Sequence, residues 1–184
     1  MHINNKTIIK DDNPILRNKS KKVDLPLDKK DKTVLLNMLQ YVRDSHDPDL
    51  CEKYDLRAAV GIAAIQLGIE KQMLAVCIET EEKTTEYALV NAKIVSYSLQ
   101  DAYLANGEGC LSAAVEHEGH VFRHARVTIR AYDLLQDKEI TIRAKGYEAI
   151  VLQHEIDHFS GIMYYDSIDS ENPWKEDNNA IVIE

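Results

Sequence analysis

The segment Gln153-His154-Glu155-Ile156-Asp157-His158 holds an H-E-x-x-H pentad. Residues four apart lie on one face of a helix, so His154 and His158 can both reach a single metal ion. Glu155 then projects beside them, within reach of a water molecule at that ion. The apolar run Ala149-Ile150-Val151-Leu152 precedes the pentad, which indicates that the helix enters the core. The pentad therefore predicts a buried helix that carries a hydrolytic metal site.

The surrounding pattern predicts an α+β fold with mostly antiparallel sheets packed around this central helix. Helical spacing of apolar residues predicts a first helix over 31–45, and the pentad helix is expected to run from Gly146 to about Gly161, a suitable C′ glycine. Asn13-Pro14 is expected to begin a short helical turn, and His46-Asp47-Pro48-Asp49 to end the first helix. Between the helices, apolar runs predict strands at 73–79, 86–91 and 93–99, and alternating runs at 120–132 and 140–144 predict a hairpin.

Length and charge suit one soluble domain. The 184 residues are expected to form a single domain, 1–184, with 170–184 as a loose polar tail. The net charge of −9 argues against a nucleic-acid site, and the short basic cluster at 17–22 is interpreted as solvated surface. The sequence shows neither a signal peptide nor a membrane span, so no membrane partner is expected and a cytoplasmic location is predicted.

Two histidines leave a metal ion short of ligands, because catalytic sites usually supply three from the protein. Downstream of the pentad the candidates are carboxylates. Upstream, Glu108-Gly109-Cys110-Leu111-Ser112 places a cysteine beside a glycine, and its thiolate would complete a His₂Cys site. A small buried hydrophobe is the alternative interpretation of Cys110. Cys77 lies in an apolar run and is predicted to be core, whereas Cys51 is expected in a polar loop without a role. The downstream carboxylates are Asp166, Asp169 and Glu171.

Three segments, in order, resemble the signature motifs of peptide deformylases. Residues 59–66, Ala59-Val60-Gly61-Ile62-Ala63-Ala64-Ile65-Gln66, resemble a Gly-x-Gly-Leu-Ala-Ala-x-Gln pattern. Residues 108–112 match the second motif and residues 153–158 match the third. The resemblance extends over about residues 10–168, and the segment 121–129 looks like the longer, Gram-positive-type subgroup. Three ordered motifs are far more specific than one H-E-x-x-H.

The resemblance implies a role for each matching residue. Cys110, His154 and His158 would hold the metal, with a metal-bound water as the nucleophile. Glu155 would be the general acid/base, and the Gln66 side chain and the Leu111 backbone N–H would donate to the oxyanion. The implied reaction is hydrolysis of the formyl group from the N-terminal formyl-methionine of new polypeptides, with release of formate.

The substrate groove and the supporting contacts are predicted from the same segments. Val60 and Gly61 would let an extended substrate approach as an added strand. Ile150 and Val151, one turn before His154, match positions that line the methionine pocket, although ordinary helix core is an equally good interpretation. Ala59 replaces the first motif glycine, which would cost energy if that position needed a positive φ. Among the contacts that support the metal ligands, we expect Glu108 to accept a hydrogen bond from a ligand imidazole and Asp157 to pair with Arg123.

The implied cofactor is one divalent metal ion, iron(II), with zinc, nickel or cobalt able to replace it, because a His₂Cys site accepts all four. The implied partners are formyl-Met N-termini and, transiently, the ribosome.

Two other functions fit parts of the pattern. An ordinary H-E-x-x-H zinc peptidase would take a downstream ligand and ignore the formyl group, but no histidine follows His158. A non-catalytic metal-binding or ribosome-associated module would bind metal without turnover, and the presence of Glu155 and Gln66 argues against it.

Overall fold

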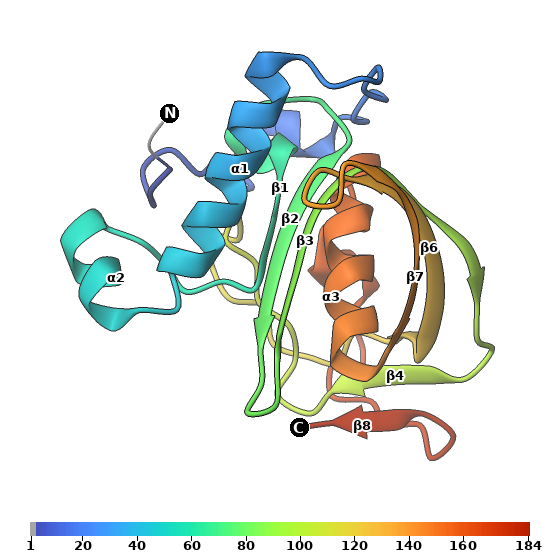
Figure 1. Cartoon of the computed structure of the whole chain (residues 1–184). Helices are drawn as coiled ribbons and strands as arrows, with labels where there is room; N and C mark the ends of the chain where they lie inside the picture. The colour runs from blue at the N-terminus through green and yellow to red at the C-terminus, as the bar shows by residue number, and fades with distance from the viewer. Residues whose placement is uncertain (1–2) are drawn as a thin grey trace.

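The computed structural model describes residues 3–184 as an α+β fold with two sheets. The larger sheet has the order β1-β2-β3-β6-β7, with neighbours antiparallel, and it curves around helix α3 (Figure 1). Its strands are β1 (Gly61–Ala63), β2 (Met73–Glu79), β3 (Thr84–Tyr97), β6 (Arg126–Asp133) and β7 (Lys138–Lys145). The predicted arrangement of antiparallel strands around the pentad helix is confirmed.

The smaller sheet has the order β5-β4-β8 and lies beside one end of α3 (Figure 1). Strand β4 (Asp101–Leu104) pairs antiparallel with β5 (Arg123–His124) and parallel with β8 (Ile181–Ile183). The sequence predicts a loose tail over 170–184; in the structure, β8 ties the last residues of that segment to β4. Among residues 3–184, no helix is long and apolar enough to cross a membrane.

Helix α1 (Lys29–Asp44) covers the outer face of β1 and β2, whereas α3 (Gly146–Asp157) lies in the concave face of the sheet (Figure 1). The Asp28 side chain caps α1 by accepting from the Asp31 backbone N–H at 2.7 Å. Helix α2 (Pro48–Tyr54) follows α1 after a short turn. Within residues 3–184 there are also four 3-10 turns: η1 (Pro14–Arg17), η2 (Ala64–Leu67), η3 (His158–Ser160) and η4 (Tyr164–Ser167).

Residues 73–78 of strand β2 are apolar because both faces of the strand are buried there. Alternate residues point to opposite faces of a strand. Met73, Ala75 and Cys77 join the core under α1, and Leu74 and Val76 join the core under α3. A strand buried on both faces reads as a continuous apolar run, and the bounds predicted for it are confirmed.

Several predicted elements need correction. The strands expected at 86–91 and 93–99 are one strand, β3, whose pairing with β6 shifts register between Val90 and Lys93. Asn91 absorbs the irregularity with a φ of 54°, a conformation that asparagine tolerates. The run expected at 120–132 divides between β5 and β6, which belong to different sheets. Cys51 lies in α2 and not in a polar loop, because Asp47 caps a helix that begins at Pro48.

The predicted helix from Gly146 to about Gly161 is confirmed as α3 continued by η3. Gly161 ends it in the left-handed region, with a φ of 71°. Any side chain there would meet the backbone of Arg17, whose carbonyl oxygen lies 2.3 Å from the position of an added Cβ. The turn Pro14–Arg17, also predicted, therefore packs directly against the end of the pentad helix.

Truncation of a core residue in α1 should destabilise the protein. Leu35 is fully buried, whereas its neighbour Leu36 is 47 % exposed. Leu35→Ala is expected to lower the free energy of unfolding by about 2–5 kcal/mol, because it leaves a cavity. Leu36→Ala is the matched control and should change it by less than about 0.5 kcal/mol. Chemical denaturation measures both values, and equal losses would contradict the proposed packing of α1.

Candidate metal centre

Cys110, His154 and His158 come together although the cysteine lies 44 positions before the first histidine. Each offers one ligand atom, and the three atoms lie within 4.8 Å of one another. The Cys110 sulfur is 3.5 Å from His158 Nε2. All three residues are buried. One sulfur and two imidazole nitrogens form a donor set that suits a transition metal ion.

The loop that follows β4 delivers Cys110, and α3 delivers the two histidines. His154 lies in the last turn of α3, and His158 is its C-cap residue and the first residue of η3. Among the described residues, none of the downstream candidates Asp166, Asp169 and Glu171 joins the cluster. Asp166 pairs with Arg17 and receives the Met163 N–H, and Asp169 receives the backbone N–H groups of Glu171 and Asn172.

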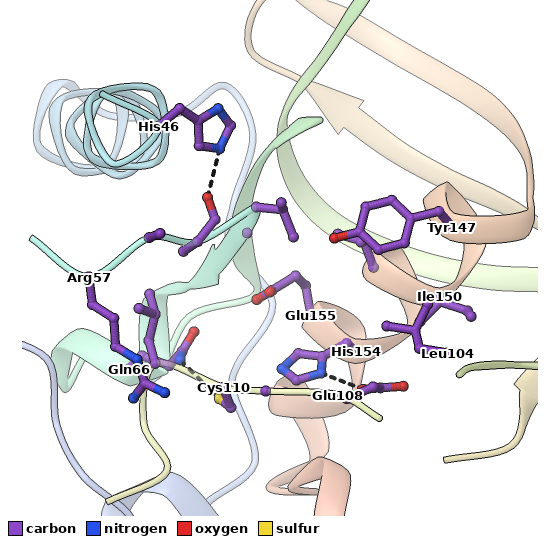
Figure 2. A pocket seen from close by; sticks show the side chains of 17 residues that line it. His46, Arg57, Gln66, Leu104, Glu108, Cys110, Tyr147, Ile150, His154 and Glu155 are labelled. Atoms are coloured by element: carbon purple, nitrogen blue, oxygen red, sulfur yellow. Dashed lines mark hydrogen bonds and ion pairs between the residues drawn. The ribbon is translucent and has the colours of Figure 1, made fainter. Parts of the chain in front are cut away.

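Glu108 holds the His154 ring in place, as predicted. His154 Nδ1 is hydrogen-bonded to Glu108 Oε2 at 2.8 Å (Figure 2). Because the carboxylate only accepts, the ring proton lies on Nδ1 and Nε2 is free for a metal ion. Arg123 donates to both oxygens of Glu108, at 2.5 and 3.0 Å, and to Asp157 at 2.8 Å. The predicted pairing of Asp157 with Arg123 is therefore confirmed.

The charges of the centre favour a thiolate. Burial alone would raise the pKa of Cys110, but the His158 and His154 imidazoles outweigh burial and hold this pKa well below its usual value. A lowered thiol pKa makes the sulfur a better metal ligand.

Glu155 lies beside the cluster with an unusual environment for a carboxylate. Burial raises the pKa of Glu155 to about 7. Among residues 3–184, its Oε2 atom has no hydrogen-bonding partner. The carboxylate also explains Gly61, because a Cβ added to that glycine would lie 2.6 Å from Glu155 Oε1. Glu155 thus reaches the wall of the groove and keeps one oxygen free.

Gln66 is buried in η2, not in a strand, and its amide is fixed at both ends. Its Oε1 accepts from the Ala63 N–H at 2.8 Å. Its Nε2 donates to Ser112 Oγ at 3.1 Å and faces the Cys110 sulfur at 3.5 Å. The donor end of the amide therefore points toward the metal cluster.

A cavity of about 340 Å³ opens beside the cluster (Figure 2). The four residues predicted to contact substrate, Val60, Gly61, Ile150 and Val151, all lie on its wall. Ile150 and Val151 also pack into the apolar core, as the alternative interpretation of these side chains predicted. Ala59 has no positive φ, so its replacement of glycine carries no backbone strain.

The cavity wall includes further residues that the sequence predicts for the site: Gln66, Cys110, Leu111, His154 and Glu155. It also includes residues that the sequence analysis did not identify: His46, Arg57, Ala58, Leu104 and Tyr147.

Two imidazoles from a buried helix lie beside one sulfur at the side of a cavity, with the Glu155 carboxylate next to them. This arrangement defines a metal-dependent hydrolase. The comparisons with known proteins agree. A family model described as polypeptide deformylase matches residues 5–174. The chain is 48 % identical to peptide deformylase 2 of Bacillus subtilis over 178 residues, which are 96 % of each chain. It is 47 % identical to the peptide deformylase of Oceanobacillus iheyensis over 180 residues, 97 % of this chain and 98 % of the other.

Solved structures show the same fold. A peptide deformylase from Legionella pneumophila is 28 % identical, with a TM-score of 0.72 over 90 % of this chain and 87 % of that one. The enzyme from Thermus thermophilus is 26 % identical, with a TM-score of 0.69 over 91 % and 88 %. The chain belongs to the polypeptide deformylase family. Its relatives in Bacillus, Oceanobacillus and Staphylococcus agree with the predicted Gram-positive-type subgroup.

Arg123 should be essential to the stability of the centre. It is buried between Glu108 and Asp157. Arg123→Met leaves the Glu108 charge buried without its bidentate partner, and the free energy of unfolding should fall by about 3–5 kcal/mol. Arg126→Met, an exposed arginine on β6, is the control and should cost less than about 0.5 kcal/mol. Denaturant unfolding checks this, and a wild-type midpoint for Arg123→Met would disprove it.

Proposed function

We propose that the chain removes the formyl group from the N-terminal formyl-methionine of newly made polypeptides and releases formate. Family membership supports the reaction class, and the observation that carries the mechanism is the buried Glu155 carboxylate, which has one free oxygen beside the sulfur and imidazole cluster. We also infer that residues 1–184 act as one domain, since the family match covers residues 5–174 and β8, beyond that match, pairs with β4 inside it.

Cys110, His154 and His158 would hold one divalent ion, and we infer iron(II), which a soft sulfur and two imidazoles accept alongside zinc, nickel and cobalt. Such an ion lowers the pKa of a water molecule from about 15.7 toward 7 and supplies hydroxide near neutral pH. The donor set fits: Glu108 engages His154 through Nδ1, which leaves Nε2 to face the cluster, and the Cys110 pKa is lowered. Burial of all three residues keeps bulk water away from the ligands.

Glu155 would move the proton. Its carboxylate accepts a proton from the attacking water and returns it to the amine nitrogen as the bond from that nitrogen to the formyl carbon breaks. Formate and a free N-terminal amine are then the two products. A pKa raised by burial to about 7 suits both halves of this transfer, since the group can take up and release a proton near neutral pH.

Gln66 and Leu111 would stabilise the oxygen of the formyl group as negative charge develops on it. The Gln66 amide is held with Nε2 toward Cys110, because its Oε1 is fixed by the Ala63 N–H. Leu111 follows Cys110 directly and lines the same cavity. Fixed donors of this kind contribute much of the catalysis in acyl transfer.

The substrate backbone would pair with the groove wall. Strand β1 is the edge of the five-stranded sheet, with β2 on one side. An extended peptide can add to such an edge through main-chain hydrogen bonds. The methionine side chain would then enter the apolar part of the cavity, between Val60, Ile150 and Val151.

Removal of the proposed sulfur ligand should release the metal. Cys110→Ala leaves two imidazoles, and elemental analysis of the purified variant is expected to show about one ion per chain fewer than wild type. Cys51→Ala and Cys77→Ala should both retain this centre's ion. Full occupancy in the Cys110 variant would exclude it as a ligand.

Removal of the proton carrier should abolish turnover without removing the metal. General acid–base groups contribute about 10²–10⁴-fold, so Glu155→Gln is expected to lose kcat on formyl-Met-Ala to that extent. Its metal content and circular dichroism should stay close to wild type, since Glu155 is not among the three ligands. Turnover at the wild-type rate would refute the mechanism, and loss of metal would make Glu155 a ligand or a structural brace.

A further inference from the structure

A second group of metal-ligating side chains lies where α1 ends against β2. His46 follows the C-cap of α1, and Cys77 and Glu79 are two residues apart on β2, so both point to the same face of the strand. The three residues offer one nitrogen, one sulfur and one oxygen, all within 4.8 Å of one another. Cys77 is buried, His46 half-buried and Glu79 exposed, so an ion could enter from solvent and reach the sulfur.

The His46 ring is already oriented for a ligand. Its Nε2 lies 2.8 Å from the carbonyl oxygen of Ala59 (Figure 2). A carbonyl only accepts, so the proton is on Nε2, and Nδ1 faces Glu79 Oε1 at 3.3 Å. In the neutral ring, Nδ1 and Glu79 Oε1 both accept, so either a proton or a metal ion can join these two atoms. A carbonyl behind one imidazole nitrogen is the usual support for a metal on the other.

The Cys77 sulfur is the third ligand atom of the group, and its thiol must lose a proton to bind a metal ion. Burial, followed by the neighbouring Glu86 carboxylate, raises the pKa of the Cys77 thiol to about 11. The thiol lies 3.6 Å from Glu86 Oε1, and Arg43 holds Glu86 through two hydrogen bonds of 2.5 and 2.6 Å. Arg43 therefore holds Glu86, whereas Glu79 faces the His46 ring. Metal binding must displace the thiol proton, and the negative charge of Glu79 favours the incoming cation.

We propose that His46, Cys77 and Glu79 form a second metal site, for a zinc-class divalent ion, separate from the Cys110–His154–His158 cluster. A sulfur and an imidazole select zinc or cobalt over calcium and magnesium, which require oxygen ligands. Water would complete the coordination on the exposed side.

Two of the three ligand residues also support the substrate groove. His46 bonds the Ala59 carbonyl, and the Cys77 backbone N–H donates to the Val60 carbonyl at 2.9 Å. Ala59 and Val60 both line the cavity beside Glu155. An ion that joins His46 to Cys77 would therefore brace this wall from behind. Amide hydrogen exchange of residues 59–61 should slow when the site fills.

Zinc stoichiometry tests the site on the holoenzyme. Equilibrium dialysis against zinc should load wild type with one more ion per chain than Glu79→Gln, a change at an exposed side chain that preserves size. Glu81→Gln, also exposed and two residues away, should load like wild type. The loss of a ligand should weaken affinity for the extra ion by at least about 10-fold. The measured quantity is a difference, so it does not depend on whether the Cys110 cluster binds metal. Equal stoichiometry in wild type and Glu79→Gln would overturn the proposal.

Cobalt identifies the sulfur. In a Cys110→Ser background, cobalt should still produce a near-ultraviolet thiolate charge-transfer band. The band should persist when Cys51→Ser is added and disappear when Cys77→Ser is added. A band that survives the loss of Cys77, or none in the Cys110→Ser background, would overturn the assignment. Unchanged exchange at residues 59–61 in the zinc-loaded enzyme would overturn the bracing of the groove.

Discussion

The buried carboxylate of Glu108 is the contact on which the centre depends. A charge removed from water costs several kcal/mol unless it is paired and hydrogen-bonded. Glu108 meets this cost with Arg123 from β5 and with His154 from α3. Since Cys110 is two residues further along the chain, the same contact places the sulfur against the histidines. One ionic network thus joins three segments that are distant in sequence.

The remaining structure keeps this network dry and rigid. Helix α3 lies inside the curved sheet, and its residues from Ala149 to Glu155 are buried. Apolar contacts to β2 and β6 fix the helix, so the imidazoles have little freedom. The burial of Glu155 lowers the stability of the fold, because one of its oxygens has no hydrogen-bonding partner among the described residues. Such an unpaired group is expected at a functional site, where reactivity outweighs stability.

Sequence reasoning recovered the elements whose signal is local. Helix α1 and strand β2 follow from apolar spacing, and the end of η3 follows from Gly161. Reasoning failed where pairing is long-range: three residues at 181–183 do not indicate a parallel partner at β4, and the residues of β5 do not indicate a different sheet from β6. Helix α2 is also missed, because Asp47 and Pro48 mark both the end of α1 and the start of a new helix, and only the first meaning is apparent from the sequence.

For the candidate site, the two histidines and Glu155 follow from the pentad. Cys110 could be assigned only through the family resemblance, because sequence spacing does not predict a contact between residues 44 positions apart. Nothing in the sequence marked Arg57 and Tyr147 as residues of the cavity wall.

Formate release is the measurement that tests the account most directly. The protein, prepared without oxygen and with its metal content determined, would be incubated with formyl-Met-Ala and, separately, with Met-Ala. The account predicts stoichiometric release of formate from the first peptide and no cleavage of the peptide bond in either. Cleavage of Met-Ala would indicate a peptidase, and an absence of formate from metal-loaded protein would contradict the assignment of a deformylase site to this fold.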